Sequence, residues 1–326
     1  YEPGSGSTIM AYAGICSPQN LQTHSDDYFH WISIQEIVNY TTLSFGNGCP
    51  VTTATGVIEP VVDAGVGGFA IPINTPFALK ATATTTGTAT YCWEESDLGP
   101  AGSPTAPSGN APIFRSFDPV ASPTRTFPKL SSLLNNTSTI GEILPSYARS
   151  LTFKVTVRDT QAGGVGVIND GIAFSVAASG PFLVTAPNTA VTWNGGSMNS
   201  VTWNVAGTDG APVSCSTVNI LLSTDGGNTW PHLLASGTPN DGSESVLAIP
   251  KARHLAVTVY DMILERFMAD QPRLRSQIEG KRRMVGGGSY QGCVLARMRS
   301  GRHPAGQTKG PEYCLISSTH KREMHT

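Results

Sequence analysis

Few residues of this 326-residue chain have the types and spacing that catalysis or metal binding requires. Glu94, Glu95 and Asp97 form an acidic group, and glycoside hydrolases use paired carboxyls as acid and as base or nucleophile. The alternative interpretation, which we adopt, is a solvated strand end. His24 and His30 lie six residues apart, and no His-Glu dipeptide occurs in the sequence. Zinc helices need a different histidine spacing, so we expect surface or capping roles for both histidines.

A second spaced motif occupies residues 223–230, STDGGNTW. It resembles the Asp-box of sialidase-like propellers, S-x-D-x-G-x-T-W, at Ser223, Asp225, Gly227, Thr229 and Trp230. The resemblance implies a hairpin in which Asp and Ser hold the turn and Trp packs beneath it, without any chemistry. A propeller needs several blades, and the sequence holds one copy. We therefore expect a hairpin of a β-sandwich and not a sialidase.

The most informative residues are at the N-terminus. Residues 4–16, GSGSTIMAYAGIC, resemble the Met-turn of metzincin zinc peptidases, specifically the reprolysin-like (adamalysin-type) branch of secreted bacterial proteins. Residues 26–37, DDYFHWISIQEI, resemble the start of the last helix of the same catalytic domain. The resemblance implies that residues 1–50 are the C-terminal piece of such a domain.

The same resemblance implies roles for Met10 and Tyr12. Metzincins bind zinc through H-E-x-x-H-x-x-G-x-x-H, whose Glu activates the zinc-bound water. Met10 would form an apolar floor under the three imidazoles, as a structural residue and not a ligand. Tyr12 would either stabilise the oxyanion or pack within the turn. Because the zinc motif is absent from the sequence, we expect the ligands upstream of Tyr1 and this chain alone to be inactive.

The elements that position these residues are mainly strands. Apolar and polar residues alternate with period two in residues 151–158, as a half-buried strand requires. Trp93 is the expected core anchor of an immunoglobulin- or cadherin-like β-sandwich over residues 51–179. Residues 95–146 are rich in Pro, Ser, Gly and Asn, which predicts an elaborate or partly ordered surface loop. Further strand-like runs lie at 69–73, 77–84, 88–94 and 172–177.

One helix is expected in the first 250 residues, between residues 25 and 46. Residues 25–27, SDD, offer N-cap chemistry, and Ser33 with Glu36 fits a capping box. Apolar residues between 34 and 38 recur at helical spacing. Gly46, Gly48 and Pro50 end the segment.

A second immunoglobulin-like module is predicted for residues 180–250, with strands at 191–193, 201–205 and 218–222. It is shorter than the ~100 residues of a complete sandwich, so we expect it to be incomplete unless residues 254–260 supply a strand. Both modules resemble those that follow the peptidase domain in such bacterial proteins. Related modules bind calcium through clustered Asp, and Asp159 and Asp170 make calcium the weaker candidate cofactor beside zinc.

Residues 251–326 differ in composition. They carry 14 Lys and Arg against 6 Asp and Glu, whereas residues 1–250 carry 7 against 17. A helix over 255–271 with a solvated basic tail is one interpretation, and an irregular tail from a shifted reading frame or a foreign segment is the one we favour. A nucleic-acid arm is disfavoured because few aromatic residues are present to stack bases.

Cysteine usage and hydropathy suit a secreted protein without a membrane span. The six cysteines form no CxxC pair, and Cys16 and Cys49, which bracket a compact segment, are the candidates for a disulfide. No stretch of about 18 apolar residues occurs. The chain begins at Tyr1 without an initiator Met, which predicts a fragment or a processed product.

Two functions remain open from the sequence. The first is a fragment of an extracellular zinc metalloendopeptidase acting on proteins or peptides. The second is a non-enzymatic adhesion or binding protein built from immunoglobulin-like modules, with contact to a cell surface or matrix. Neither includes nucleic acid as a partner.

Overall fold

The computed structural model describes residues 1–189, 191–249, 255–257, 290–300 and 312–315. Strands dominate the described residues, as the sequence predicts. The chain divides into two compact units, Tyr1–Pro181 and Phe182–Thr326. Residues 1–50 belong to the first unit together with the predicted sandwich, because they hydrogen-bond to its strands.

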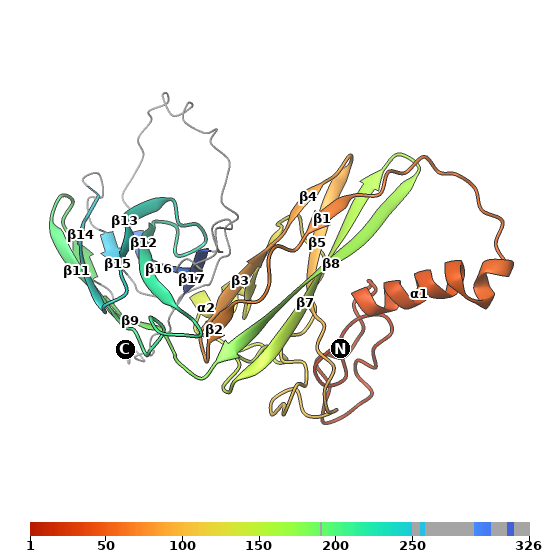
Figure 1. Ribbon diagram of the computed structural model, residues 1–326, viewed down its shortest axis with the longest axis horizontal. Coiled ribbons are helices and arrows are strands. Elements are labelled where there is room, and N and C mark those ends of the chain that lie inside the picture. Colours follow the sequence, from red (N-terminus) through yellow and green to blue (C-terminus); the bar gives the residue numbers. More distant parts are fainter. Residues whose placement is uncertain (190, 250–254, 258–289, 301–311, 316–326) are drawn as a thin grey trace. The chain divides into compact units, whose positions relative to one another are not determined.

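The first unit is built around a four-stranded sheet in the order β2-β8-β7-β5. The long hairpin of β7 and β8 forms its centre (Figure 1). β2 runs parallel to β8, and the other neighbours are antiparallel. Two smaller sheets pair β1 with β4 and β3 with β6. The strands are β1 (Val61–Asp63), β2 (Ala70–Pro72), β3 (Phe77–Lys80), β4 (Thr82–Thr84), β5 (Thr88–Glu95), β6 (Thr124–Phe127), β7 (Arg149–Gln161) and β8 (Gly164–Ala177).

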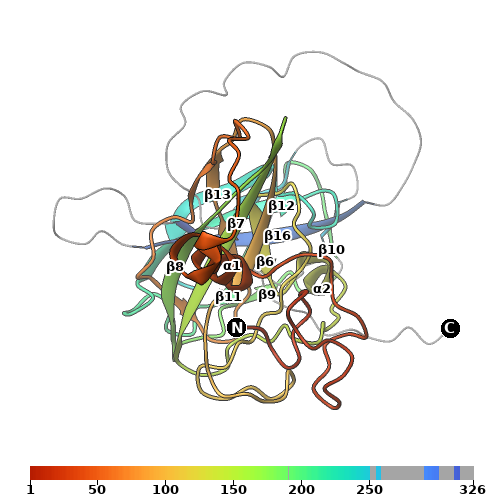
Figure 2. The same ribbon diagram turned by 90° about the vertical axis from the view of Figure 1, so that its right-hand side faces the viewer.

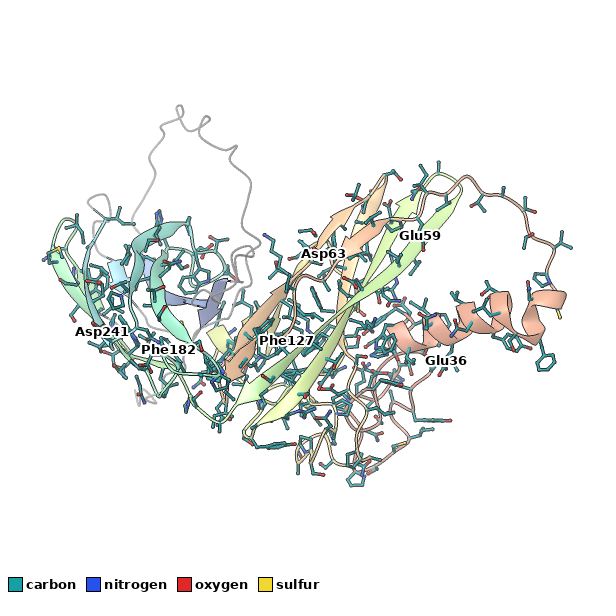
Figure 3. The ribbon with its side chains drawn as sticks, viewed as in Figure 1. Glu36, Glu59, Asp63, Phe127, Phe182 and Asp241 are labelled. Carbon is teal, nitrogen blue, oxygen red and sulfur yellow. The ribbon has the colours of Figure 1, made fainter. Side chains whose placement is uncertain are left out.

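An aromatic cluster fills the core of the first unit. Phe77 stacks on Phe127 with ring centroids 4.9 Å apart, and Phe153 of β7 lies 4.7 Å from Phe127. Figure 3 places Phe127 in the interior, between β3 and β7. Aromatic pairs at these distances stabilise a core beyond their buried area. The predicted period-two pattern of residues 151–158 is confirmed, and Trp93 is buried as expected.

The insertion between β5 and β7 is ordered through its described length. It contains β6 and the short helix α2 (Leu130–Leu134). The ion pairs Arg149–Asp97 and Arg125–Glu142 fix the insertion to the rest of the unit. Of the two predicted alternatives, the elaborate ordered loop is therefore the one that the structure has.

The predicted helix is α1 (Trp31–Leu43), followed by the 3-10 turn η1 (Phe45–Gly48). Both predicted N-caps are wrong. His30 caps the helix, because its Nδ1 accepts from the backbone N–H of Ile32 at 3.5 Å. Ser33 lies inside the helix, where it is buried. Figure 2 shows α1 nearly end-on in front of β7 and β8.

The second unit has a three-stranded sheet, β14-β11-β9, and a six-stranded sheet, β10-β15-β16-β12-β13 with β17 beside β16. Val218, Ile220 and Leu222 alternate along β12 as core residues. Trp203 is also buried, and its Nε1 donates to Asn240 Oδ1 at 2.8 Å. The strands are β9 (Leu183–Ala186), β10 (Val191–Trp193), β11 (Met198–Asn204), β12 (Cys215–Ser223), β13 (His232–Pro239), β14 (Ser243–Leu247), β15 (Leu255–Val257), β16 (Tyr290–Ser300) and β17 (Glu312–Leu315).

The described parts of residues 251–326 correct two expectations. Residues 255–257 form the strand β15 and not the start of a helix, and they pair with β10. β16 pairs with β12 along most of its length, and β17 pairs with β16, so these parts are not an irregular tail. Their backbone supplies strands that the sequence analysis found missing from the second module. The remainder of the predicted helix, 258–271, lies outside the described residues.

Candidate functional site

The N-terminal loop closes on the carboxylate of Glu2. This carboxylate accepts hydrogen bonds from Ser7 N at 2.8 Å and from Thr8 Oγ1 at 2.6 Å. Ser7 and Thr8 are buried. Gly4 has φ +53° and lies so close to the chain that a Cβ would be 2.4 Å from Gln19 O, so the close approach requires glycine. The loop is therefore fixed by its polar residues.

Met10 and Tyr12 are exposed within this chain. The exposed fraction is 65% for Met10 and 66% for Tyr12, and the roles that the resemblance implies for them stay predictions. The physical reason is the orientation of the loop, whose buried side is occupied by Ser7 and Thr8 on Glu2. The apolar residues that follow then face outward.

The two histidines take the surface and capping roles expected for them. His24 is exposed. His30 is buried as the cap of α1, and burial, with the nearby N-terminal ammonium, lowers its pKa from 6.5 to about 3. A charged imidazole would be costly there. Within the described ranges, no three His, Cys, Asp or Glu side chains come together as metal ligands.

The acids of β5 are buried, which contradicts the predicted solvated strand end. The cause is the alternation of side chains along the strand. Trp93 and Glu95 face the same side as the core residue Phe153, whereas Glu94 lies opposite Lys154 on the outer face of the sheet. Residues 28–34 cover that outer face, so Glu94 has 0% exposure.

Glu94 joins three segments of the first unit. Its Oε2 accepts from Trp31 N at 2.9 Å, and its Oε1 accepts from Ser116 Oγ at 2.8 Å. Thr156 of β7 donates to Oε2 at 3.4 Å, and His30 Nε2 lies 3.8 Å from Oε1. Burial raises the pKa of Glu94 from 4.5 to about 7, against the opposing effect of its hydrogen bonds.

Glu95 and Asp97 hold the insertion on its inner side. Glu95 Oε2 accepts from the backbone N–H groups of Ile113 and Phe114, both at 2.7 Å. Arg149 Nη2 lies 3.0 Å from Asp97 Oδ2 and 3.5 Å from Glu95 Oε1. Burial raises the pKa of both carboxyls. Since these acids are enclosed and bonded to the chain itself, a glycosidic bond has no access to them.

A second ion pair fixes the far part of the insertion. Arg125 Nη2 lies 3.0 Å from Glu142 Oε1, and Glu142 Oε2 accepts from Lys129 N at 2.8 Å. The other side of the Arg125 guanidinium donates to Trp93 O. Neither Arg125 nor Arg149 was predicted as a site residue, because an isolated Arg carries no local sequence signal of burial.

A shallow cleft of about 660 Å³ opens between residues 27–34, residues 118–119 and the hairpin of β7 and β8. Arg158 lines it, and its Nη2 donates to Phe29 O at 2.9 Å. The exposed carboxyls of Asp27 and Asp118 also line it. Its other lining residues are Tyr28, Ile34, Pro119 and Val167.

The candidate calcium residues bind backbone groups. Asp159 is buried, and its two oxygens accept from Thr86 N at 2.8 Å and Gly87 N at 2.9 Å. Asp170 accepts from Ala64 N at 2.8 Å. Both carboxylates thus stabilise turns, and calcium stays a prediction.

The Asp-box motif forms the hairpin between β12 and β13, as its resemblance implies. Ser223 Oγ donates to Asp225 Oδ1 at 2.7 Å and accepts from Gly227 N at 2.8 Å. Thr229 Oγ1 donates to Asp225 Oδ2 at 2.5 Å. Slight burial acts in the opposite direction, but the hydrogen bonds from Thr229 and Ser223 lower the pKa of Asp225 to about 2.

The structure has Cys16 and Cys49 as free thiols, and Cys49 is exposed beyond η1. A disulfide between them stays a prediction. Cys92 and Cys215 are buried. The end of α1 carries Cys49 on an exposed stretch of chain, whereas hydrogen bonds to Asn20 and Gln19 hold Cys16 in the N-terminal loop.

No family model matches the chain. No curated protein matches it either. Among solved structures, it is similar to fibronectin(III)-like modules of Clostridium thermocellum CbhA, with 13% identity over 82% of this chain and 100% of that one and a TM-score of 0.22. It is also similar to the chicken CNTN1 FN1-FN3 domains, with 11% identity over 80% and 66% and a TM-score of 0.20. TM-scores this low carry no argument, so the fold rests on the strand pairing itself.

Among the helices of the described residues, none has both the length and the apolar character needed to cross a membrane.

Proposed function

We propose that this chain acts as a non-enzymatic, extracellular binding protein whose β modules present surfaces to a matrix or cell-surface partner. One observation supports the proposal: the potentially reactive side chains of the first unit are buried and bonded within the chain itself. Glu94, Glu95 and Asp97 are buried and bonded to the chain. His30 is buried as a helix cap. These groups support the fold and are not presented to a substrate.

The experiment compares binding with hydrolysis in the purified chain. Immobilised matrix proteins and insoluble polysaccharides serve as ligands, and casein with added zinc serves as the peptidase substrate. We expect saturable binding to at least one immobilised ligand, unchanged by a zinc chelator, and no casein hydrolysis. Zinc-dependent hydrolysis by this chain would contradict the proposal.

A second candidate function is the C-terminal part of a secreted zinc metalloendopeptidase. The exposed apolar residues of the N-terminal loop favour it, because four of them lie within seven positions. An apolar group of this kind is expected where another polypeptide packs. In the metzincins that this loop resembles, that polypeptide would carry the zinc ligands. The four residues are Ile9, Met10, Tyr12 and Ile15.

Oxidation of methionine tests this second candidate. Met10 and Met198 are similarly exposed, at 65% and 60%, so Met198 is the matched control. Hydrogen peroxide should oxidise both at similar rates in this chain. In a product that includes any segment encoded upstream of Tyr1, Met10 should become protected while Met198 stays reactive. Equal reactivity in both products, or no upstream segment with a zinc helix, would contradict the peptidase assignment.

A further inference from the structure

The outer face of the sheet in the first unit carries a polar joint with the N-terminal segment, defined here as residues 1–48. Its centre is Glu94, which accepts the first N–H of α1 from Trp31 and the hydroxyl of Ser116. Tyr28 Oη donates in turn to Ser116 Oγ at 2.7 Å. Arg158 donates to Phe29 O. These hydrogen bonds attach the segment to the sheet around one buried carboxyl. Arg115 also attaches the segment to the insertion, because its Nη2 donates to Gln22 Oε1 and lies 4.0 Å from Asp26 Oδ2.

The groups that face Glu94 come from every element around it. His30 lies at the start of α1, and Arg158 lies on β7. Glu2 of the N-terminal loop adds a like charge. Burial raises the pKa of both Tyr28 and Cys92, so these two stay neutral near physiological pH. Burial also lowers the pKa of the Tyr1 ammonium from its usual 8.0, so this group contributes to the pH dependence as well. Glu94 and His30 are the two groups that the variants below separate.

The connection from this segment to the sandwich gives it room to move. Residues 47–56 are exposed without exception. The chain leaves the far end of α1 and reaches β1 through an arch outside the strands (Figure 1). The aromatic core lies on the other face of β7, so undocking of the segment would leave its ring contacts in place.

We propose that Glu94 and His30 form a pH-sensitive latch, in which the N-terminal segment docks on the sheet with both groups neutral and undocking returns both to water. In the pH range where the undocked form holds a carboxylate at Glu94 and an imidazolium at His30, docking protonates Glu94 and deprotonates His30. The joint is a conformational device, independent of what the chain binds.

The two pKa shifts determine how docking depends on pH. The pKa of Glu94 rises from 4.5 to about 7 on burial, so protonation favours docking, and this contribution is lost as pH rises from 4.5 to 7. The pKa of His30 falls from 6.5 to about 3 through burial and the N-terminal ammonium, so docking is lost as pH falls from 6.5 to 3. Between pH 4.5 and 6.5 the two effects have opposite signs and cancel.

Amide hydrogen exchange of residues 28–34 in the full chain measures this equilibrium, after correction for the intrinsic pH dependence of exchange. For the wild type we expect protection to change less than about threefold between pH 4.5 and 6.5. Protection should decrease below pH 4.5 and decrease again above 6.5. The amides of Val155 and Val157 in β7 report the sandwich and should keep their protection throughout.

Two variants separate the opposing groups. His30→Asn keeps a capping side chain without titrating, so protection should fall roughly 40-fold as pH rises from 4.5 to 6.5. Glu94→Gln should show the reverse, a rise of roughly 50-fold over the same range. Glu36→Gln, at an exposed position of α1, is the matched control and should follow the wild type.

A wild-type profile with a steady slope across pH 4.5–6.5 would overturn the proposal, and it requires no variant to fold. Variants that fold and keep the wild-type profile would overturn it as well. A loss of protection in β7 together with residues 28–34 would show that the segment does not undock separately, with the same consequence.

Discussion

Arg149 Nη2 lies 3.0 Å from Asp97 Oδ2, and both side chains are almost completely buried. The same guanidinium donates through Nη1 to Ala111 O at 2.8 Å. One arginine at the start of β7 therefore fastens both the end of β5 and the insertion that follows it. Without this cation, two neighbouring carboxyls would remain in a site that water does not reach.

We predict that Arg149→Met destabilises the first unit by about 3–5 kcal/mol, the usual result of removing one partner from a buried ion pair. The methionine replaces the aliphatic part of the side chain, so the loss arises mainly from the unpaired carboxyls. Urea unfolding at pH 7.5 measures it. Lys154→Met, at a partly exposed position of the same strand, is the control and should change the free energy of unfolding by less than about 1 kcal/mol.

The same variant should be rescued by acid. The pKa values of Glu95 and Asp97 are raised in the folded state, so their contribution to stability is present at low pH and lost as pH rises through the folded pKa. Removing Arg149 takes away a cation that favours ionised Asp97, and the raised pKa should rise further. The stability difference between wild type and Arg149→Met should therefore be smaller at pH 5 than at pH 8. A difference that is constant or larger at pH 5 would mean that the carboxyls are not the source of the loss.

The sequence predicted those parts of the fold that depend on local pattern. The alternation in residues 151–158 predicted β7, and the Asp-box spacing predicted the β12–β13 hairpin. Both patterns consist of residues that are neighbours in the sequence. The burial of Glu94 was not predictable in this way. It depends on coverage by residues 28–34, more than sixty positions away. A cap such as His30 was missed for the same reason, since its burial is a tertiary property.

The Met-turn resemblance illustrates a different limit. The pattern predicted a turn, and the loop is closed by hydrogen bonds from Ser7 and Thr8 to Glu2. The pattern also assigned a buried position to Met10, which requires a polypeptide on its exposed side. A short motif can specify the conformation of a loop, but residues outside the motif determine what packs on that loop.

Ser223→Ala should weaken the hairpin of the second unit. The buried Ser223 Oγ accepts from Gly227 N and Asp225 N, so its removal leaves buried polar groups unpaired. We expect a loss of about 1–3 kcal/mol in the free energy of unfolding of that unit. Thermal unfolding measures it, with Thr224→Ala as the neighbouring control because Thr224 is not fully buried. Equal effects of the two substitutions would indicate that the hydroxyl of Ser223 does not hold the turn.

Thiol labelling should divide the cysteines by burial and leave Cys16 and Cys49 unlinked. Because Cys49 is exposed, it should react with a maleimide within minutes in the folded chain, and Cys16 should react more slowly because it is partly covered. Cys92 and Cys215 are buried, and Cys92 Sγ donates to Phe117 O at 3.2 Å, so both should react only after unfolding. Peptide mapping by mass spectrometry identifies each labelled position. A mapped disulfide between Cys16 and Cys49 under non-reducing conditions would restore the pairing expected from the sequence, and it would require the end of α1 to lie against the N-terminal loop.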